Sequence, residues 1–198
     1  EPAMAEVEQA LKASPDYSVG YRIAAKIYSR QKKYREAFEN FRVAAMMSPH
    51  DKGLRFNLAM AYYHLKEYEY AAKEYRKMIQ NWPSDAKPYY ELARIYARQH
   101  KYPEAIEVLK KAVSLAPQHG KDILEVGNAL MEEAAYPEAQ QAYEMLLTLE
   151  KYQAIGHRKL GDVYEKMGEE DKAQEELKKA NEIDPENKAE KELLEEKR

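Results

Sequence analysis

The chain has no cysteine among its 198 residues, which excludes disulfide bonds and thiolate metal sites or nucleophiles. It contains only 7 glycines, no glycine-rich phosphate loop, and no G-x-S-x-G or H-E-x-x-H motif. Its 5 histidines lack a second His at metal-ligand spacing. No apolar run approaches the roughly 20 residues that a membrane-spanning helix needs. We therefore expect no catalytic residues, no metal, no cofactor and no direct membrane insertion.

The chain also lacks an excess of positive charge, because 32 Lys and Arg face 35 Asp and Glu, for a net charge of −3. No global positive field draws it to nucleic acid or anionic lipid, so nucleic acid is disfavoured as a partner. The composition is 34% charged and 44% hydrophobic, a balance typical of a strongly helical protein. A chain without thiols is compatible with any compartment. We slightly favour the cytoplasm over the periplasm or membrane tethering through an upstream segment.

What the sequence does contain is an internal repeat. Four prolines, at 15, 49, 83 and 117, are spaced by 34 residues, and a fifth follows at 185. In units beginning at Ser18, Lys52, Ala86, Gly120 and Ala154, position 8 is always Ala or Gly and position 24 is always large. Position 20 is alanine in every unit: Ala37, Ala71, Ala105, Ala139 and Ala173.

Small residues facing large ones at helical spacing indicate two closely packed antiparallel helices. In each unit, apolar residues at positions 4, 7, 8 and 11 form one helical face, and those at 20, 24 and 27 form a second. Between them lie turn segments such as HKYPEA and AAYPEA. Pro103 and Pro137 suit the first turn of the second helix, where a missing N–H is tolerated. Each unit is therefore predicted to be a helix–turn–helix.

This pattern resembles the tetratricopeptide repeat (TPR) family, which implies an all-α, right-handed α–α superhelix (solenoid) that binds other proteins. Departures from the family pattern are local: Arg55 and His157 replace an aromatic at position 4, and Lys151 replaces the proline at position 32. The predicted organisation is a second helix of a partial repeat in 1–17, five repeats in 18–51, 52–85, 86–119, 120–153 and 154–187, and a polar capping helix in 188–198.

The resemblance implies that the first helices line a concave groove. In the first three repeats the charged groove positions are all basic except Glu91, and they surround four apolar residues, Phe56, Met60, Tyr63 and Tyr90, that have no packing role by position. We predict that this groove binds a peptide with acidic and hydrophobic side chains. The alternative is an ordinary solvated helix face. The candidate binding residues are Arg22, Lys26, Arg30, Phe56, Asn57, Met60, Tyr63, His64, Lys87, Tyr90, Arg94 and Arg98.

The family's carboxylate clamp, which grips the C-terminus of chaperone tails, is matched only in part. Asn57 and Lys87 agree with it and Arg22 keeps its charge, but Lys26 departs from it. Glu91 places a negative charge where a carboxylate would bind. We therefore do not predict a chaperone clamp.

Two other functions remain open. The first is self-assembly into a homo-oligomer through exposed repeat edges or through the N-terminal half-repeat, whose helix carries the apolar residues Val7, Ala10 and Leu11. The second is RNA binding by the basic, aromatic groove, against which the net acidity argues.

The segment TLEKYQA, residues 148–154, lacks the proline that separates other repeats. Tyr152 and Gln153 are poor helix caps. We expect this junction to be the softest or most irregular of the array.

Overall fold

The structure is a computed structural model that describes residues 2–14 and 17–187. Within these ranges the regular secondary structure consists of eleven α-helices and one short 3₁₀-helix, without a strand. The predicted all-α fold class is therefore confirmed. The chain divides into two compact units, Glu1–Pro83 and Ser84–Arg198, which we describe separately.

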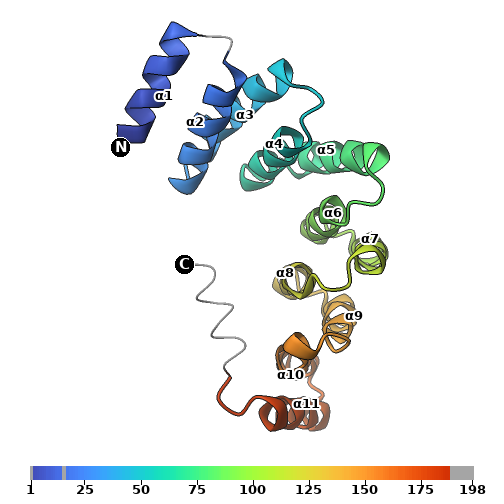
Figure 1. The fold of residues 1–198 in the computed structure, drawn as a ribbon. Coiled ribbons are helices and arrows are strands. Elements are labelled where there is room, and N and C mark those ends of the chain that lie inside the picture. Colours follow the sequence, from blue (N-terminus) through green and yellow to red (C-terminus); the bar gives the residue numbers. More distant parts are fainter. Residues whose placement is uncertain (1, 15–16, 188–198) are drawn as a thin grey trace. The chain divides into compact units, whose positions relative to one another are not determined.

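The first unit contains five helices, drawn from blue to green in Figure 1. A helix within the predicted partial repeat, α1, precedes two helix pairs, α2 with α3 and α4 with α5. A short turn joins the two members of each pair, as expected for antiparallel neighbours. The bounds are α1 Pro2–Ala13, α2 Ser18–Arg30, α3 Tyr34–Met47, α4 Lys52–His64 and α5 Tyr68–Asn81.

The described part of the second unit, residues 84–187, contains three helix pairs, α6 with α7, α8 with α9, and α10 with α11. The first helices of the first two pairs, α6 and α8, also contact each other, and α9 contacts α10. The bounds are α6 Lys87–Arg98, α7 Tyr102–Leu115, α8 Gly120–Glu132, α9 Tyr136–Leu146, η1 Glu150–Tyr152, α10 Gln153–Met167 and α11 Glu170–Ile183.

Small residues at position 8 face large ones at position 24, as the sequence predicts. A methyl group on Gly127 would overlap the ring of Tyr143, and one on Gly161 would overlap Leu177. Removing the methyl group at position 8 therefore lets the larger side chain lie directly on the helix backbone. The alanines at position 20 are all buried, at 5% exposure or less: Ala37, Ala71, Ala105, Ala139 and Ala173.

The turn inside each helix pair has one residue in the left-handed region. Its φ angle ranges from 56° at Ala134 to 76° at Gly168. Only the last repeat has glycine, the one residue that adopts this conformation without steric cost. The set occupies position 15 of every repeat: Lys32, Lys66, His100, Ala134 and Gly168.

A contact with a glutamate takes the place of aromatic packing at Arg55 and His157, the two polar residues of position 4. Arg55 lies 3.3 Å from Glu74, and His157 Nδ1 lies 2.6 Å from Glu176. Both glutamates occupy position 23 of their own repeat, and each also contacts a lysine at position 26, Lys77 at 2.7 Å or Lys179 at 2.9 Å. Burial raises the pKa of Glu176, but the hydrogen bonds from His157 and Lys179 outweigh it and leave this pKa lowered.

The junction without proline has a distinct geometry. Helix α9 ends at Leu146, and the 3₁₀-helix η1 leads directly into α10. The side chain of Gln153 donates to the carbonyl of Leu147 over 3.1 Å, and the Tyr152 ring covers Gly120. The segment is irregular, since η1 is the only 3₁₀-helix in the described residues. Its predicted softness stays a prediction.

Part of the apolar stripe on α1 packs within the chain. Leu11 lies on Gly20 of α2, and both Leu11 and Val7 are half-buried, whereas Ala10 is exposed. The stripe therefore offers a smaller surface for self-assembly than the sequence indicates. The predicted capping helix in 188–198 lies outside the described residues.

Candidate functional site

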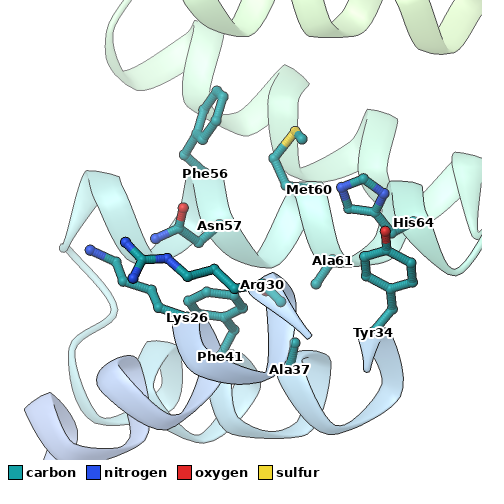
Figure 2. Close-up of a pocket in the computed structure, with 11 residues that line it drawn as sticks. Lys26, Arg30, Tyr34, Ala37, Phe41, Phe56, Asn57, Met60, Ala61 and His64 are labelled. Atoms are coloured by element: carbon teal, nitrogen blue, oxygen red, sulfur yellow. The ribbon is translucent and has the colours of Figure 1, made fainter. Parts of the chain in front are cut away.

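Helices α2, α3 and α4 of the first unit enclose a pocket of about 470 Å³ (Figure 2). Its volume lies within the range of about 300–1,000 Å³ that is usual for small-molecule and cofactor sites. Helix α3 contributes Ala37 and Phe41, and α4 contributes Phe56, Met60 and Ala61, so the lining is largely apolar. Phe41 is 3% exposed and fixed by the core of the unit. The pocket therefore combines a rigid apolar floor with accessible apolar walls.

One side of the pocket is positively charged. Lys26 and Arg30 are spaced one helical turn apart on α2, and Figure 2 shows both side chains reaching toward the same side as Asn57. Lys26 and Arg30 are exposed and form no ion pair with another described residue. The side chain of Asn57 likewise makes no hydrogen bond to another described residue. Two cations and one amide are thus available to a ligand.

A stacked aromatic pair forms the opposite side. The rings of Tyr34 and His64 lie 4.4 Å apart at an angle of 8°, and Tyr63 contacts the edge of the His64 ring at 5.7 Å. Stacking of this kind holds both side chains in place and presents flat apolar surface to the pocket. Ser29 completes the lining.

Two of the predicted binding residues of this unit lie outside the pocket lining. Arg22 is 3.6 Å from Asp51, which caps α4 by accepting a hydrogen bond from the backbone N–H of Leu54. Tyr63 is half-buried and packs beside Tyr68 at 5.6 Å. Both therefore have structural partners. The other six line the pocket together: Lys26, Arg30, Phe56, Asn57, Met60 and His64.

In the second unit, the prediction that Tyr90 has no packing role is wrong. Tyr90 is 2% exposed, and its hydroxyl donates to the carbonyl of Ala116 over 2.8 Å. Its ring stacks on His119 at 5.7 Å, and burial raises the pKa of the phenol. The residue holds α6 against the turn that precedes α8. The repeat pattern alone places position 5 on the solvent-facing side of the helix. In the structure, contact between neighbouring repeats buries the side chain at this position.

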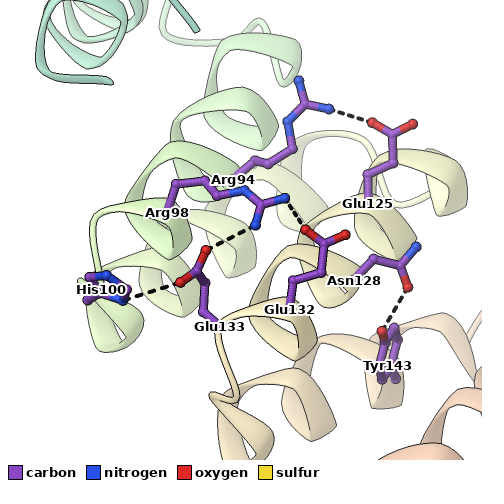
Figure 3. A network of polar contacts seen from close by, with 8 residues as sticks. All are labelled: Arg94, Arg98, His100, Glu125, Asn128, Glu132, Glu133 and Tyr143. Atoms are coloured by element: carbon purple, nitrogen blue, oxygen red, sulfur yellow. Dashed lines mark hydrogen bonds and ion pairs between the residues drawn. The ribbon is translucent and has the colours of Figure 1, made fainter. Parts of the chain in front are cut away.

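The prediction of a basic groove is also wrong for Arg94 and Arg98, because glutamates neutralise both (Figure 3). Arg94 contacts Glu91 on its own helix and Glu125 on α8, the latter at 2.6 Å.

Arg98 contacts Glu132 and Glu133 at the end of α8 and its following turn, the latter at 3.0 Å. These ion pairs join two adjacent repeats. Lys87 is exposed in the first turn of α6.

Glu91 is the one buried charged residue of the described chain, at 7% exposure. Burial raises the pKa of its carboxyl to about 7, although the positive charge of Arg94 opposes the shift. Glu125 and Asp122 on α8 add to the increase, and Lys87 acts against it. Glu91 is therefore close to half-protonated near neutral pH.

Sequence reasoning missed the part of the pocket that α3 contributes. Phe41 and Ala37 lie at positions 24 and 20, which the sequence predicts to be packing positions, and Tyr34 begins α3 at position 17. Each does pack, but one edge of each side chain also faces the pocket. The repeat pattern could have predicted this contribution. Position 24 lies beside position 8 of the same repeat, on the side that faces the next repeat.

No helix in the described part of the chain combines the length and apolar character needed to cross a membrane. Among the same residues, no group of three or more His, Cys, Asp or Glu side chains is arranged to hold a metal ion.

The sequence matches a family model over residues 55–184, which is more than half of the chain. The model is described as the middle TPR-like domain of cilia and flagella-associated protein 70. The chain belongs to this TPR-like family. A comparison with curated protein sequences gave no match.

Solved TPR structures resemble this TPR-like chain in fold. A crystal structure of the MamA protein aligns with a TM-score of 0.67 and 18% identity, and covers 86% of this chain and 93% of MamA. YrrB, described as "a TPR protein with an unusual peptide-binding site", aligns with a TM-score of 0.61 and 17% identity, over 96% of this chain and 97% of YrrB. At these identities the likeness establishes the fold alone.

Proposed function

We propose that the protein is a non-enzymatic interaction scaffold that binds a peptide segment in the pocket between its first two full repeats. The peptide carries acidic side chains, which pair with Lys26 and Arg30, and apolar side chains, which contact Phe56 and Met60. The repeat fold supports a binding role, since TPR arrays present extended surfaces to partners. YrrB, a neighbour in fold, is itself described as having a peptide-binding site.

The observation that carries the proposal is the coincidence of unpaired cations and apolar surface in one cavity. Lys26 and Arg30 have no acidic partner among the described residues, and they border the pocket that contains Phe56 and Met60. An acidic peptide gains ion pairs there without breaking existing ones. Its apolar side chains gain about 25 cal/mol for each Å² that they bury.

The proposed site is smaller than the groove over three repeats that the sequence suggests. Arg94 and Arg98 already contact glutamates, so an acidic ligand would have to compete with those partners. Tyr90 is buried and offers no surface. In the third repeat, two of the predicted cations therefore already have acidic partners, and the predicted aromatic residue is buried.

A charge reversal in the pocket tests the proposal. The probe is a fluorescein-labelled peptide that alternates Asp or Glu with Leu and Phe, and its counterpart has Lys at every acidic position. We expect the acidic probe to bind the natural chain, and the double variant Lys26→Glu/Arg30→Glu to bind it at least about tenfold more weakly, which is about 1.4 kcal/mol. Fluorescence anisotropy gives both affinities.

The matched control is Arg35→Glu/Lys73→Glu, which changes the net charge equally at two exposed residues of the same unit that do not line the pocket. Equal loss of binding in both double variants would mean that only overall charge matters. Equal binding of the acidic and basic probes would also contradict the proposal. Circular dichroism checks that the variants keep their helix content.

The alternative of self-assembly through α1 is less favoured, because Leu11 already packs on Gly20. It stays a prediction that sedimentation of the chain with Ala10→Glu tests. A concentration-dependent oligomer that the substitution dissociates would support it.

A further inference from the structure

We propose that the pocket between the first two full repeats recognises a phosphorylated serine or threonine side chain, in a peptide whose following residues are apolar. The inference rests on the proposed function and names the anion that this site prefers. The proposed function requires only acidic side chains near Lys26 and Arg30. The lining of the pocket fits a phosphate group better than it fits the carboxylate of one Asp or Glu.

The lining supplies hydrogen-bond donors without a negative charge. Lys26 and Arg30 border the pocket and form no ion pair with another residue that the structure describes. The amide of Asn57 on α4 and the hydroxyl of Ser29 on α2 add neutral donors. Among the described residues that line the pocket there is no Asp or Glu. An anion bound there is attracted by two cations, and no acidic side chain of the lining repels it.

The charge of the two cations matches one phosphate group. A carboxylate carries a single negative charge, so one Asp or Glu leaves one of the two cations without a full counter-charge. A phosphorylated serine or threonine carries about −1.5 to −2 charges at neutral pH and three acceptor oxygens. The guanidinium fork of Arg30 binds two of these oxygens, and the ammonium of Lys26, one helical turn away on α2, binds the third. Two acidic side chains would supply the same charge, but the pocket would then have to order both of them.

The apolar part of the pocket selects the residues that follow the phosphorylated one. Phe56 and Met60 are half-buried on α4, and Asn57, whose side chain lies on the side of the cations, is next to Phe56 in the sequence (Figure 2). A cube with the pocket volume of about 470 Å³ has an edge of roughly 8 Å, which an extended chain covers in two or three residues. An apolar residue one or two positions after the phosphate therefore reaches Phe56 or Met60. Its burial adds affinity that a free phosphate ion lacks.

The test compares three fluorescein-labelled peptides that differ at one position, which is phosphoserine, glutamate or serine and is followed by Leu-Phe in each. We expect the full chain to bind the phosphoserine peptide about tenfold more tightly than the serine peptide, and about threefold more tightly than the glutamate peptide. In Lys26→Gln/Arg30→Gln this preference disappears. The matched control Arg35→Gln/Lys73→Gln removes two exposed charges outside the pocket and keeps the preference. Fluorescence anisotropy gives the affinities, and circular dichroism checks the helix content.

Two competitors identify the source of the phosphate group. Inorganic phosphate has the charge without the apolar residues, and a single-stranded oligonucleotide carries only one negative charge on each phosphate. We expect the unlabelled phosphoserine peptide to displace the probe at concentrations at least about tenfold below those that either competitor requires. Displacement by inorganic phosphate at the same concentration would mean that the peptide contributes nothing. Stronger displacement by the oligonucleotide would identify nucleic acid as the ligand, and either result would overturn the inference.

Equal binding of the phosphoserine, glutamate and serine peptides would also overturn it, as would an equal loss of preference in the two double variants. If the acidic, apolar probe of the proposed function still binds through Lys26 and Arg30 in that case, only the preference for phosphate is refuted. If none of the peptides binds, the proposed function fails too.

Discussion

Buried Glu91 makes the stability of the second unit depend on pH in a way that one substitution removes. Its carboxyl pKa rises from 4.5 to about 7 because of burial, even with Arg94 in contact. The folded state therefore binds more protons than the unfolded state between these two values. By linkage, the contribution of Glu91 is fully present below about pH 4.5 and is lost as pH rises through about 7. The whole shift corresponds to at most about 3 kcal/mol.

Glu91→Gln keeps the shape of the side chain and removes the titration. Arg94 still has Glu125 at 2.6 Å, so the substitution does not leave the guanidinium without a carboxylate. We predict that the stability of the variant relative to the natural chain increases between about pH 5 and about pH 8, by up to about 3 kcal/mol. Urea unfolding followed by circular dichroism at a series of pH values gives the difference.

The matched control is Glu132→Gln, which removes the same charge from the neighbouring network. Glu132 pairs with Arg98, but its side chain is 60% exposed, so solvent screens the pair to less than about 1 kcal/mol. We expect its relative stability to change little over this range. A flat difference for Glu91→Gln as well would mean that Glu91 ionises normally, and would refute the reasoning from burial.

Three further substitutions test the account of the fold by urea unfolding. Ala134→Gly is expected to stabilise the chain by about 1 kcal/mol, because glycine adopts the left-handed conformation of this position without steric strain. Gly168→Ala is expected to destabilise the chain by a similar amount, and the opposite order of stabilities would contradict the turn geometry. A double-mutant cycle of Arg55→Ala and Glu74→Ala is expected to give a coupling energy of about 1 kcal/mol, and a value of zero would mean that the pair adds nothing. Tyr143→Phe removes the hydrogen bond that the hydroxyl donates to α8 and is expected to cost about 1 kcal/mol, whereas an unchanged midpoint would show that this bond is energetically neutral.

The repeat fold could be predicted from the sequence because its packing is local and recurs. Position 8 has to be small wherever position 24 lies against it, so Gly127 and Tyr143 predict each other. The glutamate contacts of the position-4 residues could also be predicted from the sequence. Glu occurs at position 23 only in the repeats where Arg55 or His157 occupies position 4. The contacts of Arg55 with Glu74 and of His157 with Glu176 were nevertheless not predicted.

The proposed binding surface could be predicted only in part, because its charge depends on contacts between repeats. Lys26 and Arg94 both lie at position 9 and look equivalent in the sequence. Glu125 of the following repeat neutralises Arg94, whereas Asn57, at position 6 of the repeat after Lys26, carries no charge. Aromatic residues at the groove positions likewise differ in burial, which also depends on contacts between repeats. Counting charges along one helix face cannot distinguish these cases.

The central claim is that the pocket beside Met60 takes up an acidic, apolar peptide. The methyl group of Met60 lines that pocket, and Met131 and Met145 in the second unit provide internal references. In a titration of methyl-labelled protein with the acidic peptide, we predict that the Met60 NMR signal shifts in a saturable manner and that Met131 and Met145 stay in place. A shift at the reference methyl groups with Met60 unchanged would contradict the claim.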